Sequence, residues 1–316
     1  MEGVVIKSTG SWLSVRTGQG ELYNCKLKGK FRIKGINTTN PVAVGDKVTF
    51  DLLSEEKTGL IKAIEPRFNY IIRKATKLSK VSHIIAANID QACIIVTLAH
   101  PRTSTGFIDR ILVTTEAYHI PAKIVFNKID LYDEKLKRIL HELEQIYIHA
   151  GYPCLEVSAL TGENTDDFKA MLKNKQTLVT GHSGVGKSAL INAIEPGLDL
   201  KTKDLSGYHR VGMHTTTFAE MFPLSVGGYI IDTPGIKEFG LTDFTRKEIP
   251  ERFPEMRKYM HQCRFSNCTH IHEPDCAVKE ALEKGEIALF RYENYLSILC
   301  DDYWEKTEKD YRLRKE

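Results

Sequence analysis

One eight-residue run, Gly181-His-Ser-Gly-Val-Gly-Lys-Ser188, constrains the fold of this 316-residue chain more than any other feature. It matches G-x-x-x-x-G-K-[ST], and it lies between the strand-like segment QTLVT and the helix-like segment SALINAIE. Glycines let such a turn curl with its N–H groups pointing inward, and the following helix directs its positive end at the same place. The run therefore predicts a phosphate-binding loop between a β-strand and an α-helix. The residues assigned to it are Gly181, His182, Ser183, Gly184, Val185, Gly186, Lys187, Ser188 and Ala189.

Two side chains of this loop have predicted roles toward a nucleoside triphosphate. Lys187 would bridge the β- and γ-phosphates, and the hydroxyl of Ser188 would hold Mg²⁺. The motif does not by itself say which base the nucleotide carries.

A second motif, Asn127-Lys-Ile-Asp130, follows the apolar segment AKIVF and can recognise guanine. The Asp130 carboxylate would accept hydrogen bonds from the ring N1–H and the exocyclic amino group together, a contact that adenine cannot return. Lys128 would lie along the base, and Asn127 would tie this loop to the phosphate loop. Further along the chain, Ser158-Ala159-Leu160 also ends a strand-like segment and would supply a backbone N–H to the guanine O6.

Two later segments have the composition of nucleotide switches. Asp232-Thr-Pro-Gly235 ends the apolar run GYIID, so that Asp232 would reach Mg²⁺ through water and the Gly235 N–H would sense the γ-phosphate. Upstream, Gly212-Met-His-Thr-Thr-Thr217 offers hydroxyls to the same metal. Thr216 is the predicted ligand, and Thr215 and Thr217 remain alternatives.

The order of these motifs is permuted. A Ras-like GTPase begins with the phosphate loop and ends with NKxD, whereas here the guanine motif precedes the phosphate loop. A fold depends on which strands are neighbours in space, and domain termini often lie close together, so such a permutation is tolerable. The segment 165–175 would join what are ordinarily the two ends. Between residues 88 and 235, apolar strand-like runs alternate with helical stretches, which predicts a mostly parallel sheet covered by helices on both faces.

Taken together, the motifs resemble the RsgA (YjeQ/YloQ) family of circularly permuted GTPases that act on the small ribosomal subunit. The resemblance covers essentially the whole chain, and the segments that carry it are CKLKGKF, PVAVGD, NKID, SAL, GHSGVGKS, MHTTT, DTPGIKEF and CRFSNCTHIHEPDCAV. It implies a multidomain α/β protein: an N-terminal OB-fold barrel, a circularly permuted P-loop GTPase domain and a C-terminal helical zinc-binding domain. It also implies late maturation of the small subunit, with hydrolysis of GTP to GDP stimulated by that subunit. The expected boundaries are 1–68, 69–239 and 240–316.

The first of these segments contains short β-like runs separated by turn formers, which suits a small barrel. Its stretch Lys26-Leu-Lys-Gly-Lys-Phe-Arg-Ile-Lys34 alternates cations with apolar residues, so cations would meet rRNA phosphates while Phe31 stacks on a base. A solvated, charged strand face is the alternative interpretation. The following stretch 67–83 is a basic linker that could also touch RNA. The residues assigned to RNA binding are Lys28, Lys30, Phe31 and Arg32.

Near the C-terminus, three of the seven cysteines crowd together with a histidine. Cys263, Cys268 and Cys276 supply three thiolates, and an imidazole completes a closed tetrahedral Zn²⁺ set of the structural type. Spacing leaves His270, His272 and His261 open as the fourth ligand, and the family pattern matches His270. Zinc would stabilise a small domain that has few apolar residues for a core.

Catalysis is where the sequence departs from a Ras-like enzyme. The residue after the DxxG glycine is Ile236 rather than a water-orienting glutamine, which predicts slow intrinsic hydrolysis and help from another group. His214, beside the switch threonines, is the candidate, since an imidazole can position or deprotonate the attacking water, and the resemblance points the same way. The alternative is that His214 only packs in its loop. The predicted catalytic residues are therefore His214, Lys187 and Thr216.

Composition sets outer limits on these expectations. With 42% hydrophobic and 27% charged residues, a formal net charge of +3 and no apolar run of membrane-spanning length, the chain is expected to be cytoplasmic and free of membrane contact. Nothing in it requires more than a monomer. Two rival functions remain: a non-catalytic, nucleotide-bound RNA-binding scaffold, favoured by Ile236, and an ATP-using P-loop enzyme, opposed by Asp130.

Overall fold

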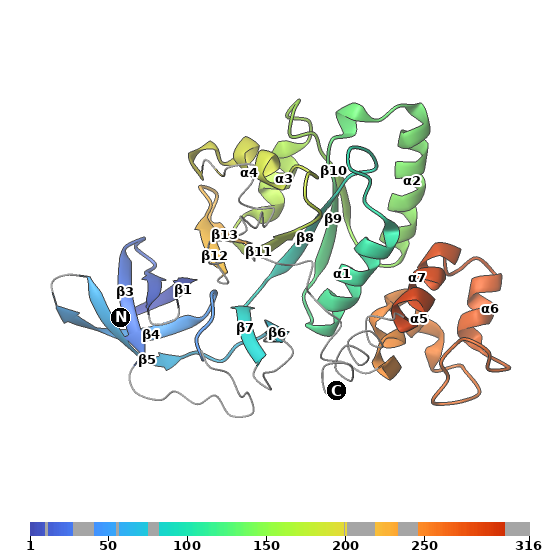
Figure 1. The fold of residues 1–316 in the computed structure, drawn as a ribbon, viewed down its shortest axis with the longest axis horizontal. Helices are drawn as coiled ribbons and strands as arrows, with labels where there is room; N and C mark the ends of the chain where they lie inside the picture. Colours follow the sequence, from blue (N-terminus) through green and yellow to red (C-terminus); the bar gives the residue numbers. More distant parts are fainter. Residues whose placement is uncertain are drawn as a thin grey trace, which may run out of the picture.

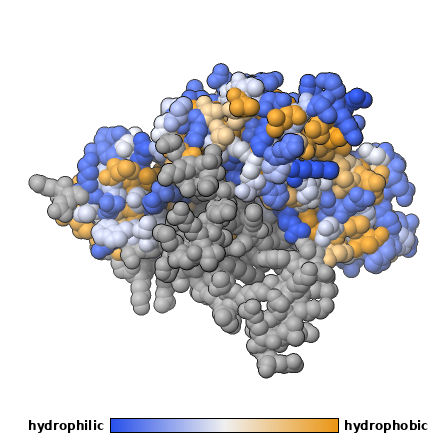
Figure 2. All heavy atoms as spheres, turned by 45° about the horizontal axis from the view of Figure 1, so that its top comes forward, coloured by the Kyte–Doolittle hydropathy of each residue, from blue (hydrophilic) through white to orange (hydrophobic). Residues whose placement is uncertain are grey.

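The structure is a computed structural model, and it describes residues 1–9, 12–27, 41–54, 57–74, 82–198, 200, 219–232 and 246–300. Figure 1 shows three parts in a row: a small β-barrel, a sheet flanked by helices, and a cluster of helices near the C-terminus. Over the face in Figure 2, hydrophobic side chains lie in separate patches among hydrophilic ones. Within the described ranges, no helix is both long and apolar enough to cross a membrane.

Five strands form the N-terminal barrel: β1 (Glu2–Ser8), β2 (Leu13–Arg16), β3 (Leu22–Leu27), β4 (Lys47–Ser54) and β5 (Thr58–Ile64). The sheet closes in the order β1-β2-β3-β5-β4-β1, with β3 and β5 parallel and the other neighbours antiparallel. This is the strand order of an OB-fold, as the sequence predicts. Strand β4 covers only part of the run VAVGDKVTFDLL. Gly45 turns the chain at a φ of 89°, and the strand begins only at Lys47.

The strands of the barrel and those of the central part belong to one continuous hydrogen-bonded sheet. Strand β1 pairs with β12 at Lys7 and Glu220, whose side chains form an ion pair at 2.9 Å. A second contact joins the barrel to the hairpin of β6 (Tyr70–Lys74) and β7 (Ser82–Ala87), where Val44 bridges Ala86. One apolar cluster, which includes Val44, Ile71 and Ile231, spans this junction.

The hairpin and its flanks correct the expectation of a basic linker. The guanidinium of Arg67 is buried and pairs with the buried Asp46 at 2.6 Å, and it also donates to the carbonyl of Pro41. Arg67 therefore holds the barrel together and is not available to contact RNA.

The central sheet has the order β10-β9-β8-β11-β13-β12, parallel except for β12. Its strands are β8 (Gln91–Val96), β9 (Ala122–Phe126), β10 (Cys154–Glu156), β11 (Lys175–Thr180), β12 (Glu220–Pro223) and β13 (Gly228–Asp232). Strand β8 is buried at every position, and its side chains alternate between the two faces. Cys93 and Ile95 join the core on one face, whereas Ile94 and Val96 join the core on the other. This is the mostly parallel, doubly covered sheet that the sequence predicts.

Four helices cover this sheet: α1 (Thr105–Ala117) and α2 (Glu134–His149) on one face, and α3 (Thr165–Leu172) and α4 (Lys187–Ile194) on the other. Two short 3-10 turns, η1 (Ile129–Leu131) and η2 (Pro196–Leu198), follow β9 and α4. Helix α3 occupies most of the segment expected to join the permuted ends, and only Lys173 and Asn174 separate it from β11.

The C-terminal part is helical, as predicted. It contains η5 (Arg246–Glu248), η6 (Pro250–Arg252), α5 (Pro254–Met260), α6 (Ala277–Glu283) and α7 (Leu289–Leu299). Its apolar core includes Val113 of α1, so these helices pack against the central part of the molecule along α1 (Figure 1).

Candidate functional site: a nucleotide site and a metal site

The phosphate loop connects β11 to α4 at the carboxyl end of the central sheet. Two of its glycines have no room for a side chain. A Cβ on Gly181 would lie 2.2 Å from the carbonyl oxygen of Ile95, and one on Gly186 would lie 2.5 Å from Nδ2 of Asn127. Both also have positive φ, 149° and 91°. The backbone therefore passes close to β8 and to the guanine motif, and glycine alone permits both approaches.

Lys187 lies in the first turn of α4 with only 8% of its surface exposed. Its ammonium group donates to the carbonyl oxygens of Gly181 and His182 at 2.8 and 2.7 Å. The cation is thus held inside the loop, where the first N–H groups of α4 also lack helical acceptors. Ser188 is buried beside it, and Val185 anchors the loop in the core, whereas Ser183, Gly184 and Ala189 face outward. An anion of phosphate size suits this concentration of positive charge and N–H groups.

Asn127 joins three motifs that are far apart in the sequence. Its Nδ2 donates to the carbonyl of Val185 at 2.9 Å, and its Oδ1 accepts from the N–H of Ala159 at 3.2 Å. The side chain is fully buried. The NKID, SAL and phosphate-loop segments consequently meet around one amide group.

Lys128 and Asp130, from the same motif, are also held by hydrogen bonds. Lys128 has a left-handed backbone, and its Nζ donates to the carbonyls of Gly184 and His100 at 2.7 and 2.5 Å. One oxygen of Asp130 accepts from the Ser158 hydroxyl at 2.5 Å, which fixes the orientation of the carboxylate. Leu160 is 83% exposed, so only its backbone can contribute to a site here.

The switch residues fall largely outside the described residues. His214, Thr215, Thr216, Thr217, Gly235 and Ile236 belong to that group. The backbone of Asp232 is described: it ends β13, whose Ile231 pairs with Leu178 of β11. Asp232 therefore ends the strand that lies beside β11, which leads into the phosphate loop.

Tyr132 is a site residue that sequence reasoning missed. Its hydroxyl donates to the carbonyl of Asn127 at 2.9 Å and accepts from the N–H of Leu98 at 2.8 Å, so it connects the NKID loop to the end of β8. Burial raises the pKa of Tyr132 to about 12, which keeps the hydroxyl protonated. The available signal was an aromatic residue two positions after Asp130, the aspartate predicted to recognise guanine. A tyrosine at that position does not by itself predict a hydrogen bond to Leu98, which is 34 residues away in the sequence.

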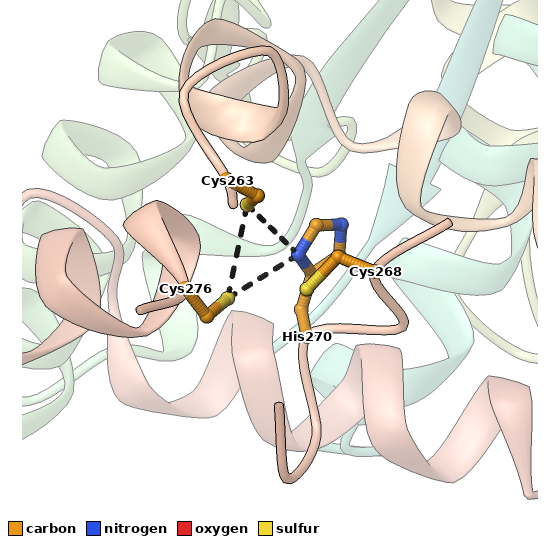
Figure 3. A group of neighbouring side chains, drawn as sticks. All are labelled: Cys263, Cys268, His270 and Cys276. Carbon is orange, nitrogen blue, oxygen red and sulfur yellow. Dashed lines mark hydrogen bonds between the residues drawn. The ribbon is translucent and has the colours of Figure 1, made fainter. Parts of the chain in front are cut away.

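The second candidate site is the cysteine cluster. The ligand atoms of Cys263, Cys268, His270 and Cys276 all lie within 4.8 Å of one another, and the side chains point toward a common centre (Figure 3). Nδ1 of His270 is 3.6 Å from the sulfur of Cys263 and 3.4 Å from that of Cys276, and these two sulfurs are 3.9 Å apart. Tetrahedral zinc with ordinary bond lengths requires separations of roughly 3.5–3.8 Å, and these three separations are close to that range. The chemistry of the four donors also suits Zn²⁺. Among the described residues that could serve, His270 joins the cysteines, whereas His261 and His272 do not.

Three further side chains shape the loop that carries His270. Glu273 accepts hydrogen bonds from the N–H and hydroxyl of Thr269 and from the N–H of Ile271. Burial acts to raise the pKa of Glu273, but the hydrogen bonds from Thr269 outweigh it and hold that pKa well below its usual range. Tyr292 and Tyr295 of α7 donate to the carbonyls of His270 and Thr269, each at 2.5 Å. The sequence did not single out these residues, because they hydrogen-bond to the loop and do not belong to the cysteine–histidine cluster.

The residues predicted to contact RNA, Lys28, Lys30, Phe31 and Arg32, lie outside the described residues. The described part of the barrel carries Trp12, which is 42% exposed. The Nζ of Lys26 lies 4.2 Å above the centre of the Trp12 ring. An exposed aromatic ring beside a cation is the pairing by which single-stranded nucleic acid is bound.

Comparison with known proteins agrees with this geometry. Residues 64–242 match the model for the RsgA GTPase, and residues 2–61 match the RsgA N-terminal domain. The chain is 54% identical over 312 residues to the small ribosomal subunit biogenesis GTPase RsgA of Bacteroides fragilis strain YCH46, covering 99% of each protein. It is 52% identical to the protein of the same name from Porphyromonas gingivalis strain ATCC 33277, covering 98% of this chain and all of that one.

Two solved structures share the fold. YjeQ from Thermotoga maritima superposes with a TM-score of 0.77 at 39% identity, covering 94% of this chain and 96% of that one. YloQ, described as a circularly permuted GTPase, superposes with a TM-score of 0.73 at 30% identity, covering 94% and 93%. The permuted order of motifs and the resemblance found in the sequence are thereby confirmed, and the chain belongs to the RsgA GTPase family.

Proposed function

We propose that this chain is a GTPase of small ribosomal subunit biogenesis. GTP hydrolysis is the activity of the family to which it belongs, and relatives that match nearly its whole length are named for that role. The observation that carries the proposal is the junction at Asn127, where hydrogen bonds to Val185 and Ala159 bring the guanine motif, the SAL segment and the phosphate loop to one point.

Each end of GTP has a proposed partner. Asp130 would accept two hydrogen bonds from guanine, Lys128 would lie along the base, and a backbone N–H of the SAL segment would face the guanine O6. At the other end, Lys187 would leave its carbonyl acceptors for the β- and γ-phosphates. The short bond from Ser158 supports the role of Asp130, since it orients the carboxylate before the base arrives.

Hydrolysis would depend on a metal ion and on the switch segments. Mg²⁺ would neutralise phosphate charge when bound, with Ser188, Thr216 and Asp232 as its proposed protein contacts. His214 is proposed to position the attacking water, because Ile236 cannot. We expect the intrinsic rate to be slow and the subunit to raise it.

The cysteine cluster is proposed to bind one structural Zn²⁺. Three thiolates and Nδ1 of His270 surround a single point and leave no open position, which favours a structural ion over a catalytic one. We divide the chain accordingly into a barrel at 1–68, a GTPase domain at 69–239 and a zinc-binding helical domain at 240–316.

The proposed partner surface includes the barrel. The Trp12–Lys26 pair supports contact with rRNA, together with Lys28, Lys30, Phe31 and Arg32 of the adjoining basic run. The protein would act as a monomer in the cytoplasm, where small subunits mature.

Co-sedimentation with isolated small subunits tests this proposal. With a non-hydrolysable GTP analogue the protein should sediment with the subunit, and with GDP it should remain at the top of the gradient. Equal association in both nucleotide states, or none in either, would argue against a GTP-controlled subunit factor.

A further inference from the structure

The imidazole of His182, in the phosphate loop, lies against the ring of Phe107 from α1. The two ring centres are 3.5 Å apart and the planes differ by 25°, so the rings are stacked nearly face to face. Neither residue belongs to the guanine motif or to the switches, and the G-x-x-x-x-G-K-[ST] pattern places no requirement on position 182.

The stack acts on a part of the loop that matters for phosphate binding. The carbonyl of His182 is one of the two acceptors of Lys187, at 2.7 Å. The same peptide unit fixes the direction of the next N–H, and a phosphate-binding loop works only if successive N–H groups point inward. Holding the His182 ring therefore holds both the lysine acceptor and the adjacent N–H.

The turn of α1 that carries Phe107 is itself fixed by neighbouring side chains. It lies in the first turn of α1, where its N–H is capped by the hydroxyl of Ser104. The side chain of Asn294 from α7 lies beside the same turn, since a Cβ on Gly106 would be in ordinary contact with its Oδ1 at 3.4 Å. Asn294 also donates to Asp109 at 2.6 Å. The first turn of α1 thus contacts both the phosphate loop and α7.

We propose that Phe107 is a positioning residue of the nucleotide site, which holds the phosphate loop in its binding conformation through His182. This rests on the proposed function, because it assumes that the loop binds GTP and GDP. The ring adds no contact to the nucleotide. It lowers the cost of ordering the loop, and its loss should raise the dissociation constant and KM while changing kcat little.

The test is calorimetric titration of GDP and a non-hydrolysable GTP analogue into wild-type protein, Phe107→Ala and Phe107→Tyr. Phe107→Ala should weaken both nucleotides by about three- to tenfold, the range for loss of one aromatic pair, and Phe107→Tyr should restore wild-type affinity. His182→Ala should weaken them similarly, and combining it with Phe107→Ala should add little, since both changes remove one contact.

Phe290→Ala is the matched control, because Phe290 is also a half-buried phenylalanine at the rim of the same apolar cluster, but its ring contact is with Tyr147. It should lose stability comparably to Phe107→Ala and keep nucleotide affinity. Equal affinities for Phe107→Ala and Phe290→Ala would overturn the inference, as would additive effects of the two stack variants. If wild-type protein bound neither nucleotide, the proposed function itself would fail, so the two failures are distinguishable.

Discussion

Asp130 lies at the end of the guanine motif, with one carboxylate oxygen held by Ser158. Asp130→Asn would replace one acceptor by an NH₂ donor, which guanine cannot match but the C2 carbonyl of xanthine can. We expect GTP affinity to fall at least about 100-fold and affinity for xanthosine triphosphate to rise. Competition titrations measure both. Asp133→Asn is the matched control, since Asp133 is the exposed N-cap of α2 and asparagine caps equally well. An unchanged base preference in Asp130→Asn would place guanine elsewhere.

Tyr132 is hydrogen-bonded to the backbone of the same loop, at Asn127. Tyr132→Phe removes the acceptor of the buried Leu98 N–H and the donor to Asn127, so the free energy of unfolding should fall by about 1–3 kcal/mol. Nucleotide affinity should also decrease, because the NKID loop loses its hydrogen bond from the Tyr132 hydroxyl to the carbonyl of Asn127. Tyr152→Phe is the control: Tyr152 lies in the same cluster, but its hydroxyl makes a 3.5 Å contact with Glu116. Denaturant unfolding and GDP titration compare the two, and equal effects on affinity would contradict a role for Tyr132 in the site.

At the scale of elements, zinc binding at the cysteine cluster should stabilise the C-terminal helices. Cys263 follows α5 and Cys276 begins α6, so a bound ion ties the two helices to the loop of His270. Cys276→Ser should lose about one equivalent of zinc per chain and lower the hydrogen-exchange protection of α5–α7. Cys300→Ser, at the exposed end of α7, should change neither. Retention of both zinc and protection in Cys276→Ser would contradict the assigned ligand set.

The elements also show which features a sequence can predict. Glycine spacing and apolar runs predicted β11, the phosphate loop and α4 nearly to the residue, because these signals are local. Helix α2 begins at Glu134, because the side chain of Asp133 accepts a hydrogen bond from the N–H of Leu136 and sets the start. Arg67 was misinterpreted as a free cation because its partner Asp46 is 21 residues away. Tyr132, Phe107 and Glu273 act through tertiary neighbours, so no pattern along the chain identified them.

At the scale of the whole molecule, a buried ion cluster joins the C-terminal helices to the central part. Arg291 of α7 pairs with Asp109 of α1 at 2.5 Å and with Glu255 of α5 at 2.6 Å, and all three side chains are nearly inaccessible. Tyr147 and Asn294 also donate to Asp109. Burial raises the pKa of Asp109 even though Arg291 opposes the shift.

Arg291→Met would leave two buried carboxylates without a cation, and the free energy of unfolding should fall by about 3–5 kcal/mol at pH 8. Without Arg291 the pKa of Asp109 should rise further above its unfolded value. The loss in the free energy of unfolding is then largest at a pH above the pKa of Asp109 in the folded variant. It becomes smaller as the pH falls toward the pKa of Asp109 in the unfolded chain, because protonation removes the buried charge.

Denaturant unfolding of wild type and Arg291→Met at pH 8 and pH 5.5 measures how much the loss in unfolding free energy decreases on acidification. Arg257→Met is the control, since Arg257 also joins α5 to α1, through Glu116, but on the surface. It should cost less than about 1 kcal/mol at either pH. A deficit in Arg291→Met that stays constant or grows on acidification would contradict the account of the cluster.

The central claim is that the permuted motifs form one subunit-dependent GTPase site. The most direct measurement is GTP turnover by wild-type protein and Lys187→Ala, each alone and with isolated small subunits, with the exposed-site variant Lys173→Ala as control. We expect slow turnover that rises strongly with subunits in wild type and Lys173→Ala and is absent in Lys187→Ala. Negligible turnover by wild type in both conditions, or stimulated turnover that survives Lys187→Ala, would contradict it.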